Sequence, residues 1–116
     1  MKKNEFDFRP ELVTDEGQNV RICFDIEAVE KEMPAIGDEE PVVREVFEAY
    51  VVRVDKPITR DRIVDAIITA EYPNDKMQAV VNNYLLNQKD AEHKAEFQAM
   101  QEWRAKAKNI ANEILS

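Results

Sequence analysis

This chain of 116 residues has little of several residue types on which common functions depend. It contains two glycines, one cysteine and one histidine. Phosphate-binding loops use several closely spaced glycines, so this composition argues against the common nucleotide-binding motifs. The single cysteine, Cys23, can form neither an internal disulfide nor a cysteine-rich metal site. We therefore expect no cofactor and no enzymatic activity.

Long apolar runs are also missing. No window comes near the roughly 20 apolar residues of a membrane-spanning helix. The N-terminal stretch "MKKNEFDF" lacks the apolar segment of a secretory signal. The sequence therefore predicts a cytoplasmic protein that does not bind membranes.

Positive charge is scarce relative to negative charge. The chain has 24 acidic and 16 basic residues, a formal net charge of -8. The first half carries most of it, because residues 1–58 hold 15 acids and 8 bases, which gives -7. Such a surface repels the phosphates that dominate nucleic-acid affinity. We expect no binding to nucleic acid.

What the first half does contain is the pattern of β-strands. In "NVRICFDIEAV", apolar residues alternate with polar ones, which predicts a strand with one face on the core. The run "VVREVFEAYVVRV" is less regular, and it predicts either a strand covered partly on both faces or, as we favour, a bulge. "EFDFRPELV" is a candidate for a third antiparallel strand, with its turn at "TDEGQ". The face predicted to enter the core consists of Val20, Ile22, Phe24, Ile26 and Ala28.

The second half shows the periodicity of helices. Thr59 is a suitable N-cap for a first helix that ends at Tyr72-Pro73. A second helix follows, capped by Asn74 or Asp75. The third runs from about Asp90 to Leu115. Strands followed by helices indicate an α+β fold. We predict a single domain of residues 1–116, with an antiparallel meander of two or three strands in 1–57 and three helices in 58–116.

Two clusters of polar residues are candidates for metal sites. Glu92, His93 and Glu96 offer carboxylate and imidazole ligands on one helix, but metal sites in helical bundles need ligands from several facing helices. The acidic loop Asp38–Glu40 lacks the alternating oxygen ligands of a calcium-binding loop. We expect a surface histidine, a solvated loop of unassigned role, and no bound metal.

The only tryptophan, Trp103, lies on the apolar stripe of the third helix. That helix would be about 39 Å long at 1.5 Å per residue, against a diameter of roughly 34 Å for a compact domain of this size. Two shorter helices and a small sheet would therefore leave part of it uncovered. We expect Trp103 to pack within its own chain, on Tyr84, Leu85 and Ile67.

The C-terminal turns of the same helix form the predicted interaction site. Ile110, Ile114 and Leu115 are apolar and lie beyond the expected cover, and a soluble monomer rarely exposes such a strip. We predict that they pair with another chain, most simply in a homodimer. Arg104 and Lys108 lie beside this strip. They are either a solvated flank or a patch that meets the acidic half of a neighbouring copy.

Residues 58–115 resemble small accessory proteins of phage and prophage tail regions. The resemblance rests on "ITRDRIVDAIITAEYPNDKMQAVVNNYL" followed by "EFQAMQEWRAKAKNIANEIL". It implies a structural or assembly role without catalytic residues, and a location in the virion. The matching residues are Ile63, Ala66, Ile67, Tyr72, Asp75, Ala79, Glu96, Phe97 and Trp103.

These observations lead to two hypotheses. The first is a non-catalytic structural or interaction protein that self-associates or docks through its C-terminal helix. The second is an acidic regulator that binds a nucleic-acid-binding protein by mimicking the charge of phosphate. The 15 acids of residues 1–58 motivate the second hypothesis.

Overall fold

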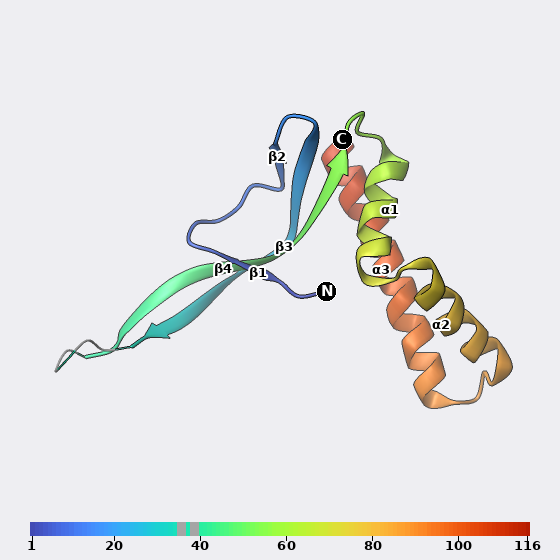
Figure 1. Ribbon diagram of the computed structural model, residues 1–116. Coiled ribbons are helices and arrows are strands. Elements are labelled where there is room, and N and C mark those ends of the chain that lie inside the picture. The colour runs from blue at the N-terminus through green and yellow to red at the C-terminus, as the bar shows by residue number, and fades with distance from the viewer. Residues whose placement is uncertain (35–36, 38–39) are drawn as a thin grey trace. The chain divides into compact units, whose positions relative to one another are not determined.

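A computed structural model describes residues 1–34, 37 and 40–116, and this part of the chain contains four strands followed by three helices (Figure 1). The α+β class and the long last helix are confirmed, whereas the expected two or three strands are four. Asp38 and Glu39 of the acidic loop lie outside the described residues. The elements are β1 Asn4–Phe6, β2 Val13–Asp15, β3 Asn19–Met33, β4 Val42–Asp55, α1 Arg60–Glu71, α2 Asn74–Leu86 and α3 Ala91–Leu115.

The chain divides into two compact units. The sheet unit is Met1–Arg53 and the helical unit is Val54–Ser116. The sheet unit holds 14 acidic and 7 basic residues, a net charge of -7. The helical unit holds 10 and 9, a net charge of -1. The uneven charge along the sequence therefore follows the division of the structure.

The strands form one sheet in the order β1-β4-β3-β2. β2 and β3 are joined by a tight turn in which the Glu16 N–H donates to the Asn19 carbonyl oxygen at 2.9 Å. The predicted turn at "TDEGQ" is thus confirmed. The stretch expected as a third strand is divided instead, because β1 pairs with β4 (Phe6 opposite Phe47) and β2 pairs with β3 (Val13 opposite Ile22). Strands of three residues are too short to show a period in the sequence.

The core face of β3 follows the predicted alternation over its first half only. Val20, Ile22 and Phe24 are buried, whereas Ile26, which was also expected in the core, is half-buried and Ala28 is exposed. The change comes after Asp25, whose φ of 52° is left-handed, as in strands interrupted by a bulge. The Phe24 ring lies 5.4 Å from that of Tyr50 on β4.

β4 is buried at residues of both parities. Val46 and Val52 are 3% and 7% exposed, and Ala49 between them has no exposed surface. This burial fits partial cover on both faces, the first of the two alternatives for this run. The left-handed residue of the hairpin, Asp25, lies in β3, and the bulge that we favoured in β4 stays a prediction.

α1 begins and ends where the sequence predicts. The Thr59 hydroxyl accepts a hydrogen bond from the Arg62 N–H at 3.2 Å, and the helix ends at Tyr72. α2 begins at Asn74 after Pro73, which has no capping side chain. Asn74 and Asp75 therefore lie inside the helix, and the expectation that one of them caps it is wrong.

α1 and α2 lie one after the other beside α3 (Figure 1). The start of α1 meets the end of α3, where the Arg60 Nε donates to the Asn112 Oδ1 at 3.1 Å. α2 packs on the first half of α3, where the rings of Tyr84 and Phe97 stack at 4.3 Å. The 12 residues of α1 and the 13 of α2 together equal the 25 of α3. α1 and α2 together therefore flank α3 along its whole length.

All three helices contribute buried residues to the helical unit. Those of the helices are Ile63 and Ile67 of α1, Val80 of α2, and Met100, Ala107, Ile110 and Ala111 of α3.

None of the helices in the described part of the chain has an apolar stretch that could span a bilayer.

Candidate interaction surfaces

The C-terminal turns of α3 are more deeply covered than the sequence predicts. Ile110 is 8% exposed and Ala111 has no exposed surface, so the expectation that Ile110 lies beyond the cover of its own chain is wrong. The reason is that α1 runs along this half of α3 instead of sharing the first half with α2. Ile114 is half-buried and Leu115 is 49% exposed. Binding of another chain by this last turn stays a prediction.

Trp103 packs within the helical unit. Its indole Nε1 donates a hydrogen bond to the Ile67 carbonyl oxygen at 2.8 Å, which confirms Ile67 as a neighbour. The Lys106 ammonium lies 5.4 Å from the centroid of the indole ring, within the range of a cation–π interaction. Tyr84 instead stacks on Phe97, and Leu85 is 61% exposed. The expectation that Leu85 covers the indole is therefore wrong.

The two basic residues of the predicted interaction site differ in their surroundings. Lys108 is exposed, whereas Arg104 is half-buried. The Arg104 Nε is buried and has no hydrogen-bond partner among the described residues. Long basic side chains commonly cover apolar surface with their stems. Arg104 fits that role, and Lys108 is the member of the pair that is available to another molecule.

The outward face of α2 carries apolar side chains in a row. Met77, Val81 and Leu85 follow one another at intervals of four residues, and next to them Leu86 is 85% exposed. A shallow groove of about 230 Å³ runs along this face between the apolar row and a row of amide side chains. The groove is lined by Asn74, Met77, Gln78, Val81 and Asn82.

A second cleft, of about 380 Å³, lies between α2 and α3. At its edge the Lys76 ammonium lies 4.8 Å from the Tyr72 ring centroid and donates to the Glu71 carbonyl oxygen at 3.2 Å. Burial raises the pKa of the Tyr72 phenol, and the neighbouring carboxylates of Glu71 and Glu96 add to the rise. This phenol is therefore a hydrogen-bonding group and not a base. The lining residues are Tyr72, Lys76, Ala79, Val80, Asn83, Glu96 and Ala99.

The histidine at the start of α3 takes part in the cap of that helix. Asp90 accepts hydrogen bonds through its Oδ1 from the N–H groups of Glu92 and His93, at 2.9 and 3.1 Å. These bonds, that of His93 first, lower the pKa of the Asp90 carboxyl. The arrangement confirms Asp90 as the cap. Among the described residues, no group of three or more His, Cys, Asp or Glu side chains is placed to hold a metal ion.

Cys23 lies on the face of β3 that was predicted to meet water, yet it has no exposed surface. The prediction failed because the sheet unit also covers this face near Arg21, whose guanidinium lies 5.6 Å from the Phe6 ring centroid. Burial raises the pKa of the Cys23 thiol, and Arg21 opposes the rise only in part. The thiol is therefore kept in its neutral, poorly nucleophilic form.

Ion pairs join several acids of the sheet unit to basic residues elsewhere in the same unit. Glu5 and Glu48 lie directly opposite each other on β1 and β4, and Lys31 of β3 pairs with both. Further pairs link Lys3 with Glu27 at 3.2 Å, Arg44 with Asp7 at 2.7 Å and Arg53 with Glu16 at 2.9 Å.

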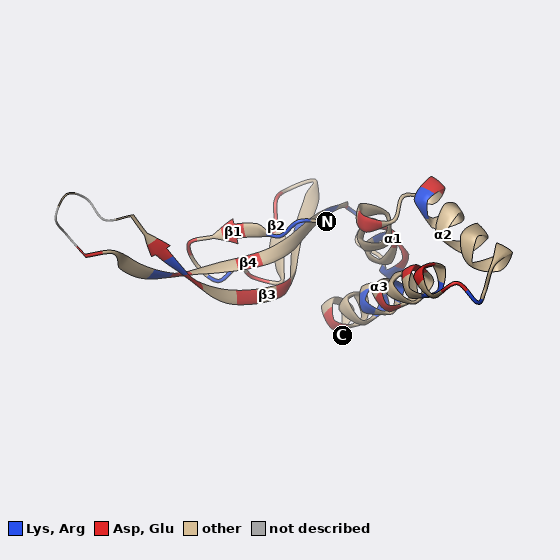
Figure 2. Ribbon diagram, turned by 90° about the horizontal axis from the view of Figure 1, so that it is seen from below, with Lys and Arg blue, Asp and Glu red and all other residues tan. Residues whose placement is uncertain are grey.

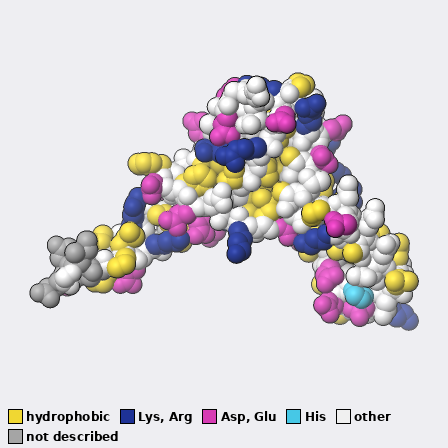
Figure 3. All heavy atoms as spheres, viewed as in Figure 1, with side chains coloured by type: hydrophobic (Ala, Val, Ile, Leu, Met, Phe, Trp, Pro, Cys, Tyr) yellow, Lys and Arg dark blue, Asp and Glu magenta, His cyan; other side chains and the backbone are white. Residues whose placement is uncertain are grey.

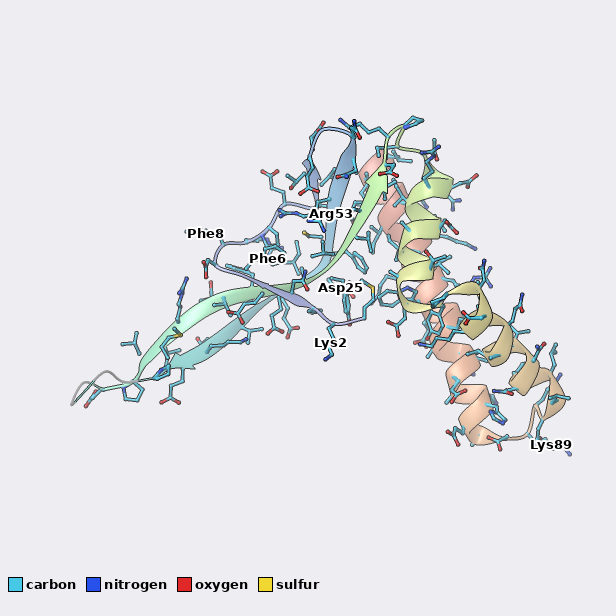
Figure 4. All side chains as sticks on the ribbon, in the orientation of Figure 1. Lys2, Phe6, Phe8, Asp25, Arg53 and Lys89 are labelled. Atoms are coloured by element: carbon cyan, nitrogen blue, oxygen red, sulfur yellow. The ribbon has the colours of Figure 1, made fainter. Side chains whose placement is uncertain are left out.

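Exposed apolar side chains of the sheet unit lie at two places. Phe8 is 84% exposed on the connection between β1 and β2, where Figure 4 shows it at the outer side of the chain. The others lie at the far end of the β3–β4 hairpin, where Met33 is 43%, Val42 65% and Val43 61% exposed. Sequence reasoning missed both places because neither a single exposed apolar residue nor an adjacent pair produces a periodic signal.

Comparison with protein-family models, with curated proteins and with solved structures finds no match for this chain.

Proposed function

We propose that this protein is a non-catalytic interaction protein that acts by docking to another protein chain, in an assembly of the kind implied by its resemblance to phage tail accessory proteins. The observation that carries this proposal is the placement of large apolar side chains in water. Scattered exposed residues are normal, but exposed residues that are adjacent indicate contact surfaces. The exposed set is Phe8, Met33, Val42, Val43, Leu85, Leu86 and Leu115.

The absence of buried polar residues in the described part of the chain supports the non-catalytic half of the proposal. Catalytic groups are usually withdrawn from water so that burial and neighbouring charges adjust their pKa values. Here the single cysteine is neutral, and the tyrosine at the α2–α3 cleft has a raised pKa.

Within the helical unit, α2 offers a better docking surface than the end of α3. Leu85 and Leu86 are adjacent and continue the apolar row of Met77 and Val81. Leu115 stands beside only one half-buried apolar residue, Ile114. Because a stable interface buries about 800 Å² on each partner, two residues at a helix end are too few. We therefore place the docking surface of the helical unit on α2.

The ion pairs of the sheet unit weigh against the second hypothesis, an acidic mimic of phosphate. A mimic needs carboxylates that are available to the basic residues of its partner. Several acids of the sheet are already paired with lysine or arginine of their own chain. The pairing leaves the surface around these residues mixed, with charges of both signs.

A site-specific photo-crosslinking experiment tests this proposal. Leu86 is replaced by a photoreactive phenylalanine derivative, and Lys94, an exposed residue on α3, is replaced in the same way as a control. After irradiation in the cells that produce the protein, we expect one adduct of defined mass from position 86 and none from position 94. An adduct of twice the chain mass of 13.5 kDa identifies self-association, and any other mass identifies a different partner. No adduct from position 86, or equal adducts from both positions, contradicts the proposal.

A further inference from the structure

The far part of the β3–β4 hairpin extends past both of its neighbouring strands, and we call its described residues in the ranges 28–34 and 40–45 the arm (Figure 1). β1 reaches β4 only at Phe47, Glu48 and Ala49, and β2 reaches β3 only at Val20, Arg21 and Ile22. Along the described residues of the arm, each strand therefore has one neighbour. The outer edge of each strand therefore presents backbone N–H and C=O groups that do not pair with any other described strand. Such an edge is a template for a further strand.

Both faces of the arm are in water as well. Residues 42–45 are all exposed, including Val42 and Val43 at 65% and 61%. Successive side chains of a strand point to opposite faces, so these two valines lie on different faces of the arm. Figure 3 shows hydrophobic side chains on its surface beside the undescribed residues. A two-stranded ribbon with neither face covered is marginally stable in water.

The arm concentrates the negative charge of the protein. Its described residues include four acids and two bases. The sequence from 28 to 45 as a whole holds six acids and two bases, a net charge of -4, which is half of the -8 of the whole chain. Figure 2 marks the charged residues along the two strands. Glu30, Glu32 and Glu45 form no ion pair with any described residue.

The two bases of the arm do not neutralise it, because both are held by acids outside it. Lys31 pairs with Glu5 and Glu48, and Arg44 pairs with Asp7. These pairs fasten the base of the arm to the rest of the sheet. The carboxylates of the arm are left facing water beside an open strand edge.

We propose that the arm binds a basic, extended segment of a partner protein, in which lysine or arginine alternates with apolar residues, and that this segment adds to the sheet as a further strand. Strand addition uses the backbone groups of the open edge, and alternate side chains give specificity. The apolar side chains of the segment would pack on Val42 or Val43, and its cations would meet the unpaired carboxylates. A second copy of this chain is a poor occupant, because two acidic arms repel each other.

This inference rests on the proposed function, that of a docking protein, and names the chemistry of one partner. Its test uses the full chain and synthetic peptides, with affinity measured by fluorescence anisotropy. The probe is an eight-residue peptide of alternating lysine and valine. One control replaces every lysine by glutamate. A second control is N-methylated at every residue, which keeps the charges and the apolar side chains but removes the backbone donors. We expect the probe to bind at least about tenfold more tightly than the N-methylated peptide, the effect of two or more lost hydrogen bonds.

Two sets of variants locate the binding to the arm. Changing Glu30, Glu32 and Glu45 to Gln should weaken binding of the probe roughly tenfold at low salt. The matched control changes three exposed acids of α3 to Gln and should leave the affinity within about twofold. Val42→Thr with Val43→Thr keeps the branched shape of both side chains, and it should weaken binding at least about threefold through lost apolar contact. The control acids are Glu92, Glu102 and Glu113.

Hydrogen exchange then decides the mode of binding. We expect the probe to protect backbone amides in residues 28–33 or 42–46 and to leave those of α2 unchanged. Equal affinity for the probe and the N-methylated peptide would overturn strand addition, as would unchanged exchange in the arm. Protection of the arm that rises with protein concentration in the absence of peptide would show that a second copy is the occupant and would also overturn the inference. Each of these outcomes leaves the crosslinking test of α2 unaffected, so the two proposals fail separately.

Discussion

Replacing Ile110 by Ala measures how far α1 covers the end of α3. The substitution removes three carbon atoms from a side chain that is 8% exposed. At about 0.8 kcal/mol for each buried carbon, the lost transfer free energy is about 2.4 kcal/mol. A residual cavity of roughly 40 Å³ adds about 1 kcal/mol. We therefore expect the free energy of unfolding to fall by about 3 kcal/mol.

The matched control is Leu115→Ala. Leu115 is also a large aliphatic residue on α3, but it is 49% exposed. Its truncation should cost about 1 kcal/mol or less, because half of the side chain is already in water and no cavity forms. Trp103 is the only tryptophan, so its fluorescence during guanidinium denaturation reports the unfolding of the helical unit alone.

Two results would refute this reasoning. A loss below about 1 kcal/mol for Ile110→Ala, or a loss equal to that of Leu115→Ala, would mean that α1 does not cover Ile110. A wild-type denaturation midpoint that rises with protein concentration, while that of Ile110→Ala does not, would mean that Ile110 is covered by a second chain. The second result would restore the homodimer predicted from the sequence.

Three further predictions concern other parts of the structure. Asp90→Ala should lower the unfolding midpoint at neutral pH. The pKa of the Asp90 carboxyl in the folded chain lies below its ordinary value of 3.8, so the stability that this cap contributes is complete above that value and is lost as the pH falls. A difference in midpoint between wild type and variant that persists unchanged in acid would contradict this role. Phe24→Ala should cost about 3–5 kcal/mol in a far-UV circular dichroism melt, since the residue is 2% exposed, and a loss under about 1 kcal/mol would count against its place in the core. Trp103→Phe should cost about 1 kcal/mol in a urea titration, through loss of the hydrogen bond to the Ile67 carbonyl, and unchanged stability would show that this bond contributes nothing.

Local signals allowed most of the helical unit to be predicted. The caps at Thr59 and Asp90 and the stop at Tyr72 depend on neighbouring residues, and all three are present in the structure. α2 lacked such a signal, because it begins at Asn74 directly after a proline that supplies no capping side chain.

Contacts between distant segments were not predictable in the same way. The pairing of Asn4 with Ala49 joins residues that are 45 positions apart. A strand of three residues is also too short to show an alternating pattern in the sequence. The cover of Ile110 depends on whether α1 and α2 lie side by side or in line, and the lengths of the helices do not decide between the two. The candidate surfaces on α2 and on the arm were missed because they consist of adjacent exposed residues, which only coordinates reveal.

The in-line arrangement of α1 and α2 along α3 also sets an order of assembly during folding. Tyr84 and Phe97 are thirteen positions apart, whereas Arg60 and Asn112 are separated by 52. The fourfold longer loop costs about 1.2 kcal/mol more in closure entropy, so α2 and α3 should form a helical hairpin before α1 docks. In rate measurements, truncation of Phe97 should then slow refolding, while truncation of Ile110 should mainly accelerate unfolding. The C-terminal half of α3 should thus be the last part of the long helix to be buried. In a newly made chain Ile110 should stay exposed until α1 packs against it.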